Sequence, residues 1–209
     1  MLQNFDFMAI LFSLPAVFLA LSWHEFAHAF VADRLGDPTP RNQGRLTLDP
    51  INHIDMIGLI MLVFAGFGWA KPVQINTGNF KNPRTGDILV SLAGCTANFI
   101  MAFFALLILY VVTYKFKINN QIFIQIVWPI VNINLMLMIL NLLPIPPLDG
   151  FHVFKNLINS KHQNILYQLD RYGFLILILL SFTGVLGFII NFLRSPILNV
   201  MSAVLSLLR

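Results

Sequence analysis

The stretch FLALSWHEFAHAFVA, residues 18–32, places three ionisable side chains inside an apolar run long enough to lie within a membrane. Glu25 is the only glutamate in the chain of 209 residues, His24 stands directly before it, and His28 follows three residues later. Charged groups are costly in hydrocarbon, so ionisable residues inside a membrane-spanning segment indicate a functional site. This stretch therefore predicts both a spanning helix and a site built into it.

The spacing of His24 and His28 indicates the chemistry of that site. On an α-helix, positions i and i+4 lie about 40° apart around the axis, so both imidazoles point the same way. Two imidazoles on one face can bind a divalent metal ion, and a neighbouring glutamate can act as general base on a metal-bound water. The pattern is typical of one half of a zinc-peptidase site.

The composition is that of a polytopic membrane protein. Hydrophobic residues make up 57% of the chain, charged residues make up 11%, and the mean hydropathy is +0.77. A soluble domain carries roughly twice that charged share. We expect one integral-membrane domain over 1–209, with a core at 7–155 and C-terminal helices within 172–208. The net charge of +4 is spread over loops, which argues against nucleic acid as a partner, and the single cysteine, Cys95, excludes a disulfide within the chain.

Apolar runs predict an all-α polytopic membrane protein with about five to six transmembrane or re-entrant helices. A spanning helix needs about 20 apolar residues, so the 14-residue run 57–70 is expected to be re-entrant and the short tail to be interfacial. Two β-prone stretches, 45–48 and 72–76, predict a small membrane-associated β element between the first helix and the third apolar segment. The apolar runs are 7–32, 57–70, 88–114, 122–143, 172–193 and 196–208.

The distribution of basic residues predicts the orientation. If 57–70 turns back, nine Lys and Arg residues share one side, and Lys115, Lys117, Arg194 and Arg209 are left for the other. The positive-inside rule then places the richer side in the cytoplasm, with the active site near it. The nine residues are Arg34, Arg41, Arg45, Lys71, Lys81, Arg84, Lys155, Lys161 and Arg171.

The segment NLLPIPPLDG, residues 141–150, offers a third ligand. It follows the predicted 122–143 helix at a depth similar to that of the histidine pair, and its prolines end the helix. Taken alone, Asp149 would be read as a loop or cap carboxylate. Catalytic zinc sites commonly use two histidines and one carboxylate, however, so Asp149 at this depth is the candidate third ligand.

These residues together resemble the site-2 protease family of intramembrane zinc metalloproteases, in its compact prokaryotic branch. The resemblance implies one zinc ion per chain bound by His24, His28 and Asp149, with Glu25 as the catalytic base. The family usually has proline where this chain has Cys95. The segments that carry the resemblance are HEFAH (24–28), GRLTLDP (44–50), GWAKPV (68–73), AGCTAN (93–98) and NLLPIPPLDG (141–150).

Three further residues are candidates for substrate binding. Asn98 and Asn141 would hold the substrate backbone or the developing oxyanion, although buried asparagines also commonly join neighbouring helices. His53, in the loop after the first helix, would reach the site and bind metal or substrate, and a solvated loop histidine is the alternative.

The predicted function is hydrolysis of peptide bonds in transmembrane or membrane-associated protein segments, as regulated intramembrane proteolysis or membrane-peptide clearance. The partners expected are a membrane-protein substrate and the lipid bilayer. An unwound substrate would pair with the β-prone stretches as an added strand. One rival is a metal permease or sensor, and another is an inactive relative that holds membrane proteins. The presence of Glu25 beside complete ligands argues against both.

Overall fold

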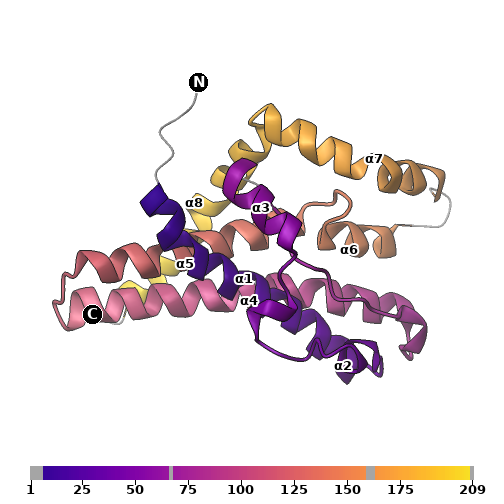
Figure 1. Ribbon diagram of the computed structural model, residues 1–209, viewed down its shortest axis with the longest axis horizontal. Helices are drawn as coiled ribbons and strands as arrows, with labels where there is room; N and C mark the ends of the chain where they lie inside the picture. Colours follow the sequence, from indigo (N-terminus) through magenta and orange to yellow (C-terminus); the bar gives the residue numbers. More distant parts are fainter. Residues whose placement is uncertain (1–6, 66–67, 159–162, 208–209) are drawn as a thin grey trace.

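The protein, seen here in a computed structural model, is described over residues 7–65, 68–158 and 163–207. Figure 1 shows a helical molecule joined by short connections. Short 3-10 turns lie at Pro50–Asn52 and Thr77–Asn79, and a π-turn at Val111–Lys115 extends α4. The α-helices are α1 (Phe7–Arg34), α2 (Thr39–Asn42), α3 (Met56–Ala65), α4 (Pro83–Tyr110), α5 (Gln121–Leu142), α6 (Asp149–Leu157), α7 (Gln163–Phe182) and α8 (Val185–Ser206).

Five of the helices in the described ranges, α1, α4, α5, α7 and α8, are long and apolar enough to cross a membrane. This confirms the prediction of a helical, multi-pass membrane protein. α3 has 10 residues, which is too short for a span, and its re-entrant path stays a prediction.

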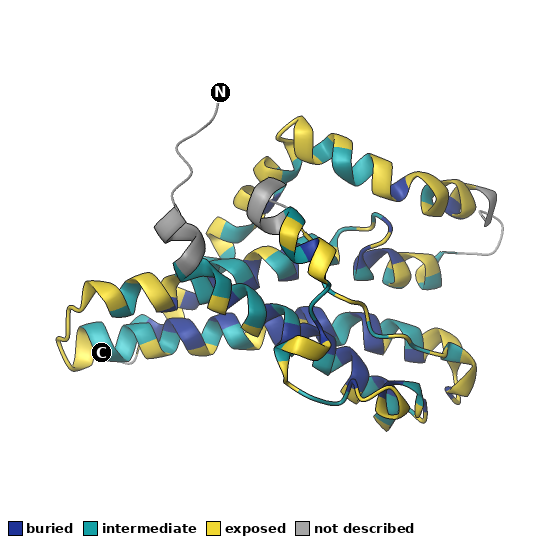
Figure 2. Ribbon diagram, viewed as in Figure 1, coloured by how far each residue is buried: buried dark blue, intermediate teal, exposed yellow. Residues whose placement is uncertain are grey.

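The core lies where α1, α4 and α5 pack together, with α8 laid against α4 and α5 (Figure 2). Val131 and Leu135 of α5 are fully buried there, and α8 adds Ile190, Met201 and Leu205 to the same cluster. Small residues let helices approach closely in membranes. α1 accordingly buries four alanines, which are Ala16, Ala20, Ala29 and Ala32.

The predicted β element is wrong, because the described residues contain no β-strand. Within these residues, the β pairing in this region is limited to one isolated antiparallel bridge between Ile54 and Ala70. Side chains bind the backbone that a strand partner would have used. Arg45 Nη2 donates to the carbonyls of Lys71 and Pro72, at 2.6 and 2.8 Å. Because the described residues form no strand here, the expectation that a substrate pairs with this region as an added strand is no longer supported.

The C-terminal region also differs from expectation. A single span at 172–193 and an interfacial tail at 196–208 were predicted, but the chain forms α7 and α8 with a break at Thr183 and Gly184. Gly184 has a φ of 76°, in the left-handed region that glycine adopts readily. Hydropathy does not register such a turn between two apolar helices. α8 then continues through Pro196, which removes only one helical hydrogen bond.

Candidate metal centre

Three predicted ligands meet in space. Nε2 of His24 lies 2.9 Å from Nε2 of His28, and Oδ2 of Asp149 lies 3.1 and 3.2 Å from these two nitrogens. The histidines come from one face of α1, and Asp149 is the first residue of α6. The structure therefore brings together side chains from distant parts of the sequence as a three-atom cluster.

The protonation of the two imidazoles follows from their outer contacts. His24 Nδ1 donates to Asn98 Oδ1 at 2.6 Å, and His28 Nδ1 donates to the Val90 carbonyl at 2.7 Å. The Val90 carbonyl can only accept a hydrogen bond. The atom of Asn98 that faces His24 is its carbonyl oxygen, because the amide nitrogen donates to Ala20 and Asn134. In the neutral rings each Nε2 therefore presents a lone pair to the cluster, the form that ligates metals.

This donor set fits zinc. Oδ2 of Asp149 is buried and accepts no hydrogen bond from the described residues, and it converges with two imidazole lone pairs. Three acceptors repel one another unless a cation lies among them. Ligands about 2.0–2.2 Å from a tetrahedral zinc lie about 3.3 Å apart, close to the spacings seen here.

Gly94 of α4 makes room for both rings. A Cβ atom at this position would lie 2.5 Å from His24 Cε1 and 2.6 Å from His28 Nε2. Val90, Gly94 and Asn98 follow one another at intervals of four residues, so they share one face of α4. On that face, Val90 accepts a hydrogen bond from His28 and Asn98 accepts one from His24. Gly94, between them, leaves space for both rings.

Asn98 has a different role from the expected substrate binding. Its side chain is 0% exposed, and its amide nitrogen donates to the Ala20 carbonyl at 3.1 Å and to Asn134 Oδ1 at 2.8 Å. Its oxygen accepts from His24, so its polar atoms are already engaged. Asn98 thus positions His24 and joins α1, α4 and α5.

Sequence reasoning gave Asn134 no role in the site. The residue is also 0% exposed, and its own amide donates to the Ile130 carbonyl at 2.8 Å. An asparagine inside an apolar span is a sign of a functional or structural role, but α5 contains several asparagines. Only the three-dimensional contact with Asn98 distinguishes Asn134 from the other asparagines of α5.

The helix that carries Asp149 is docked on the beginning of α4. Oδ2 of Asp87 accepts from Asn156 Nδ2 at 2.6 Å and lies 3.5 Å from His152 Nδ1, while Arg84 donates to the Asn156 carbonyl. The hydrogen bond that His152 donates to the Asp87 carboxylate raises the pKa of His152, and burial offsets part of this increase. Through these contacts α4 also fixes the position of the third ligand.

Glu25 lies beside the ligands without joining them. It is 8% exposed, and its Oε2 accepts a hydrogen bond from the backbone nitrogen of Val73 at 2.9 Å. That contact brings the segment after α3 against the site.

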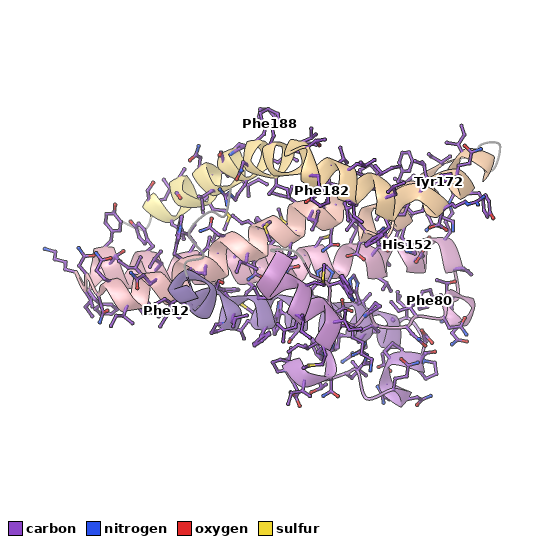
Figure 3. All side chains as sticks on the ribbon, turned by 45° about the horizontal axis from the view of Figure 1, so that its top comes forward. Phe12, Phe80, His152, Tyr172, Phe182 and Phe188 are labelled. Carbon is purple, nitrogen blue, oxygen red and sulfur yellow. The ribbon has the colours of Figure 1, made fainter. Side chains whose placement is uncertain are left out.

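A cavity of about 1180 Å³ opens onto the cluster. Asn141 lines it, as does His152, which Figure 3 labels together with Phe182 of the facing α7. The cavity therefore has a polar wall that carries the ligands and an apolar wall from α7 and α8. The polar wall includes His24, Glu25, His28 and Asp149, and the apolar wall includes Phe174, Leu177, Ile178, Phe182 and Leu186.

His53 does not reach the site, which corrects the expectation that it binds metal or substrate. It is 0% exposed and lies outside the cavity lining, and its Nε2 donates to the Thr47 carbonyl at 2.7 Å. Its own carbonyl accepts from the backbone nitrogen of Lys71 at 2.8 Å. Its role is to hold the loops around 45–54 and 70–73 together.

Comparison with known proteins agrees with this geometry. A family model described as Peptidase family M50 matches residues 110–183. The provisionally named zinc metalloprotease YwhC of Bacillus subtilis is 37% identical over 197 residues, which is 89% of each chain. The provisionally named zinc metalloprotease Rip2 of Mycolicibacterium smegmatis is 32% identical over 81% of this chain and 66% of its own. The zinc metalloprotease MJ0392 of Methanocaldococcus jannaschii is 25% identical over 77% of this chain and 38% of its own.

No solved structure matches the chain. The likeness to YwhC extends over nearly all of both sequences, and the M50 match includes Asp149. The chain therefore belongs to peptidase family M50, the site-2 protease family of intramembrane zinc metalloproteases.

Proposed function

We propose that His24, His28 and Asp149 hold one catalytic zinc ion and that Glu25 is the general base for hydrolysis of membrane-embedded protein segments. The convergence of three acceptor atoms within 3.2 Å of one another carries this proposal. Glu25 lines the same cavity and forms no hydrogen bond or ion pair with the three ligands, which supports the second part of the proposal.

Zinc held by His24, His28 and Asp149 would supply a Lewis acid, which would polarise the scissile carbonyl and make water a stronger acid. Glu25 accepts the proton of the attacking water and delivers it to the leaving amine. The Val73 N–H holds Oε2 of Glu25, which leaves Oε1 for this transfer. Asn98 and the Val90 carbonyl keep Nδ1 protonated in the two rings, so that both Nε2 atoms remain ligands.

Asn141 is the remaining candidate for substrate binding. Asn141 lines the cavity, and it is the penultimate residue of α5, the helix that leads to Asp149. An amide at this place can donate to the substrate backbone or to the developing oxyanion, which is worth about 3 kcal/mol when the donor is preorganised.

The test uses wild type, Glu25→Gln and Asp149→Ala, purified in detergent and analysed for zinc per chain and for cleavage of a single-span substrate. We expect about one zinc in the first two proteins, loss of zinc from Asp149→Ala, and cleavage by wild type alone. Asp170→Ala, at an exposed position outside the cavity lining, is the matched carboxylate control and should keep both properties.

Each outcome bears on a different part of the proposal. Cleavage that survives Glu25→Gln refutes the general base. Zinc retained by Asp149→Ala refutes the third ligand. A wild type that binds zinc and transports it, but cleaves no membrane substrate, favours the permease.

The active site is proposed to face the cytoplasm. The ends of α1 and α5 that flank the cluster lie at the side where the basic residues Arg34, Arg41 and Arg84 gather, and Lys115 and Lys117 lie at the other end of α4.

Single-cysteine labelling with a membrane-impermeant thiol reagent tests this orientation. Native Cys95 is buried and gives little background. Intact cells should label Lys117→Cys and leave Lys81→Cys unlabelled until they are permeabilised. The reverse pattern would invert the topology.

A further inference from the structure

His152 lies on the cavity wall next to the third ligand. It stands three residues after Asp149 on α6, and both residues line the cavity. Residues three apart on a helix are neighbours, with Cβ atoms about 5–6 Å apart, and helical side chains lean toward the N-terminal end, where Asp149 lies. Among the described residues, the ligand atoms within 4.8 Å of one another are those of the three proposed ligands, and His152 is not a member of that cluster. Its ring is therefore a neighbour of the metal centre and not a part of it.

The imidazole of His152 is held from its Nδ1 side. Nδ1 lies 3.5 Å from Oδ2 of Asp87 on α4, and the same oxygen accepts a hydrogen bond from Asn156 Nδ2 at 2.6 Å. Nε2 forms no hydrogen bond with the described residues, and the side chain is 50% exposed. A histidine oriented through one ring nitrogen keeps the other nitrogen for a defined task. Nε2 is thus accessible to a substrate in the cavity.

The docking of α6 on α4 does not depend on this ring alone. Asn156 joins α6 to Asp87 through a shorter contact, and Arg84 of α4 donates to the Asn156 carbonyl. An ion pair with a half-exposed ring adds little to such a junction. The contact with Asp87 is better explained as an orientation of the ring for the cavity.

The charges around the ring favour its protonated form. The hydrogen bond to Asp87 raises the pKa of His152 most, and burial lowers it. Among the weaker influences, Asp149 raises this pKa and Lys155 lowers it. α7 and α8 contribute only uncharged residues to the cavity lining, and the other ionisable residues there are the two ligand histidines and Glu25. In the protonated ring, Nδ1 donates to Asp87 and Nε2 carries a second N–H.

We propose that His152 is a further catalytic residue, whose Nε2–H donates a hydrogen bond to the scissile carbonyl oxygen as water attacks, and that Asp87 orients the ring for this. The inference rests on the proposed peptide hydrolysis. The carbonyl oxygen gains negative charge during the attack, and a donor held in place beforehand stabilises that charge better than water does. The proton stays on the ring throughout. Asn141 is then the candidate for binding the substrate backbone.

The experiment uses the full-length protein in detergent with a single-span substrate, and measures kcat, KM and zinc per chain. His152→Ala should lower kcat about 100-fold, with KM changed by less than about threefold and zinc content unchanged. His152→Gln keeps a neutral N–H donor near the position of Nε2 and should recover part of the lost rate. Leu157→Ala, exposed on α6 outside the cavity lining, is the control and should match wild type.

The pH profile separates catalysis from docking. Because the protonated ring is the donor, kcat/KM of wild type should fall as the pH rises through the pKa of His152, above its ordinary value of about 6.5. In Asp87→Asn this fall should begin at lower pH, and in His152→Gln it should be absent. Asn156→Ala keeps both the ring and Asp87, so the fall should stay at its wild-type pH. Zinc content is measured across the same pH range.

Three results overturn the proposal. The first is a kcat of His152→Ala within about threefold of wild type. The second is a loss of rate that follows a loss of zinc, because the ring then serves only to dock α6. The third is an alkaline fall at the same pH in wild type, Asp87→Asn and His152→Gln. Failure of the proposed function is distinct from these, because a zinc-loaded wild type would then cleave no membrane substrate, which overturns both proposals.

Discussion

The helices that carry the metal centre and the helices that close the cavity are built differently. In the spans of α1, α4 and α5, 39%, 33% and 33% of the residues are buried, whereas α7 and α8 each bury 11% (Figure 2). The first group also buries polar side chains that satisfy one another, with Asn98 and Asn134 both 0% exposed. The geometry of the two histidine ligands is therefore fixed in the first group, and α7 and α8 form a wall that can vary without disturbing it.

Gly94 gives the strongest test of the difference between the two groups of helices. Gly94→Ala puts a methyl group about where the two imidazoles lie, so we expect zinc affinity to fall by more than about 100-fold and cleavage to be lost. Zinc titration of the purified variant, with circular dichroism to verify helix content, measures this. Near-normal zinc binding would mean that α4 shifts easily, contrary to a preassembled core.

Gly187→Ala in α8 is the matched control. A Cβ at Gly187 meets nothing within 4 Å, and alanine favours helix by about 1 kcal/mol over glycine. Zinc binding should be unchanged, and the thermal midpoint should rise slightly. A large loss of zinc binding here would refute the division between the two groups of helices.

Asn98 gives the next largest effect. Asn98→Ala leaves His24 Nδ1 without its acceptor, and loss of such an outer contact typically costs about 10- to 100-fold in metal affinity. Asn98→Asp keeps the acceptor and should retain most of the zinc affinity. Zinc competition with a chelator separates the two variants. A substrate-binding role predicts the opposite result, in which Asn98→Ala raises KM and leaves zinc affinity unchanged.

The sequence predicted what depends on local pattern. HEFAH needs only helical spacing to place His24 and His28 together, and the apolar runs predicted α1, α4 and α5 almost to their observed ends. The role of Asn98 was beyond that reasoning, because it depends on which face of α4 meets α1. The position of His53 was also beyond that reasoning. The sequence of a loop histidine is the same whether its side chain reaches a site or is buried against Thr47.

Two errors have a common cause in the use of one-dimensional signals. The β-prone residues near Pro72 form no strand, because a strand needs a backbone partner, and the Arg45 side chain binds the carbonyls of Lys71 and Pro72 instead. Hydropathy treated the region of α7 and α8 as one span because Gly184 interrupts the helix without interrupting the apolar run. Arg194 was consequently assigned to the surface rather than to the middle of α8.

Gly173 tests the same difference between the two groups of helices, because α7 touches the segment that leads to Asp149 at this residue. A Cβ at this position would lie 2.5 Å from the carbonyl oxygen of Pro146, so Gly173→Ala should cost about 1–3 kcal/mol through overpacking. Because this contact is with Pro146, three residues before Asp149, and not with a ligand, zinc affinity should change by less than about threefold. Thermal unfolding and zinc titration test both parts, and a loss of zinc as large as that of Gly94→Ala would contradict them.

The smallest effect concerns the contact between Asp87 and His152, which docks the ligand-bearing α6. Asp87 raises the pKa of His152 above its ordinary value of about 6.5. A raised pKa in the folded state gives a stabilisation that is complete below about pH 6.5 and disappears as the pH rises through the folded value. Docking of α6 should therefore weaken slightly on the alkaline side of that window, while the Asn156 bond to Asp87 persists.

NMR titration of the His152 ring, assigned by comparison with His152→Gln, measures this shift directly. In Asp87→Asn the midpoint should fall toward the ordinary value, because the carboxylate that stabilises the protonated ring is gone. Lys155→Met is a useful contrast, since Lys155 disfavours the charged ring and its removal should raise the midpoint. A midpoint in Asp87→Asn equal to that of wild type would mean that Asn156 alone holds α6 to α4. The third ligand would then be insensitive to pH through this contact.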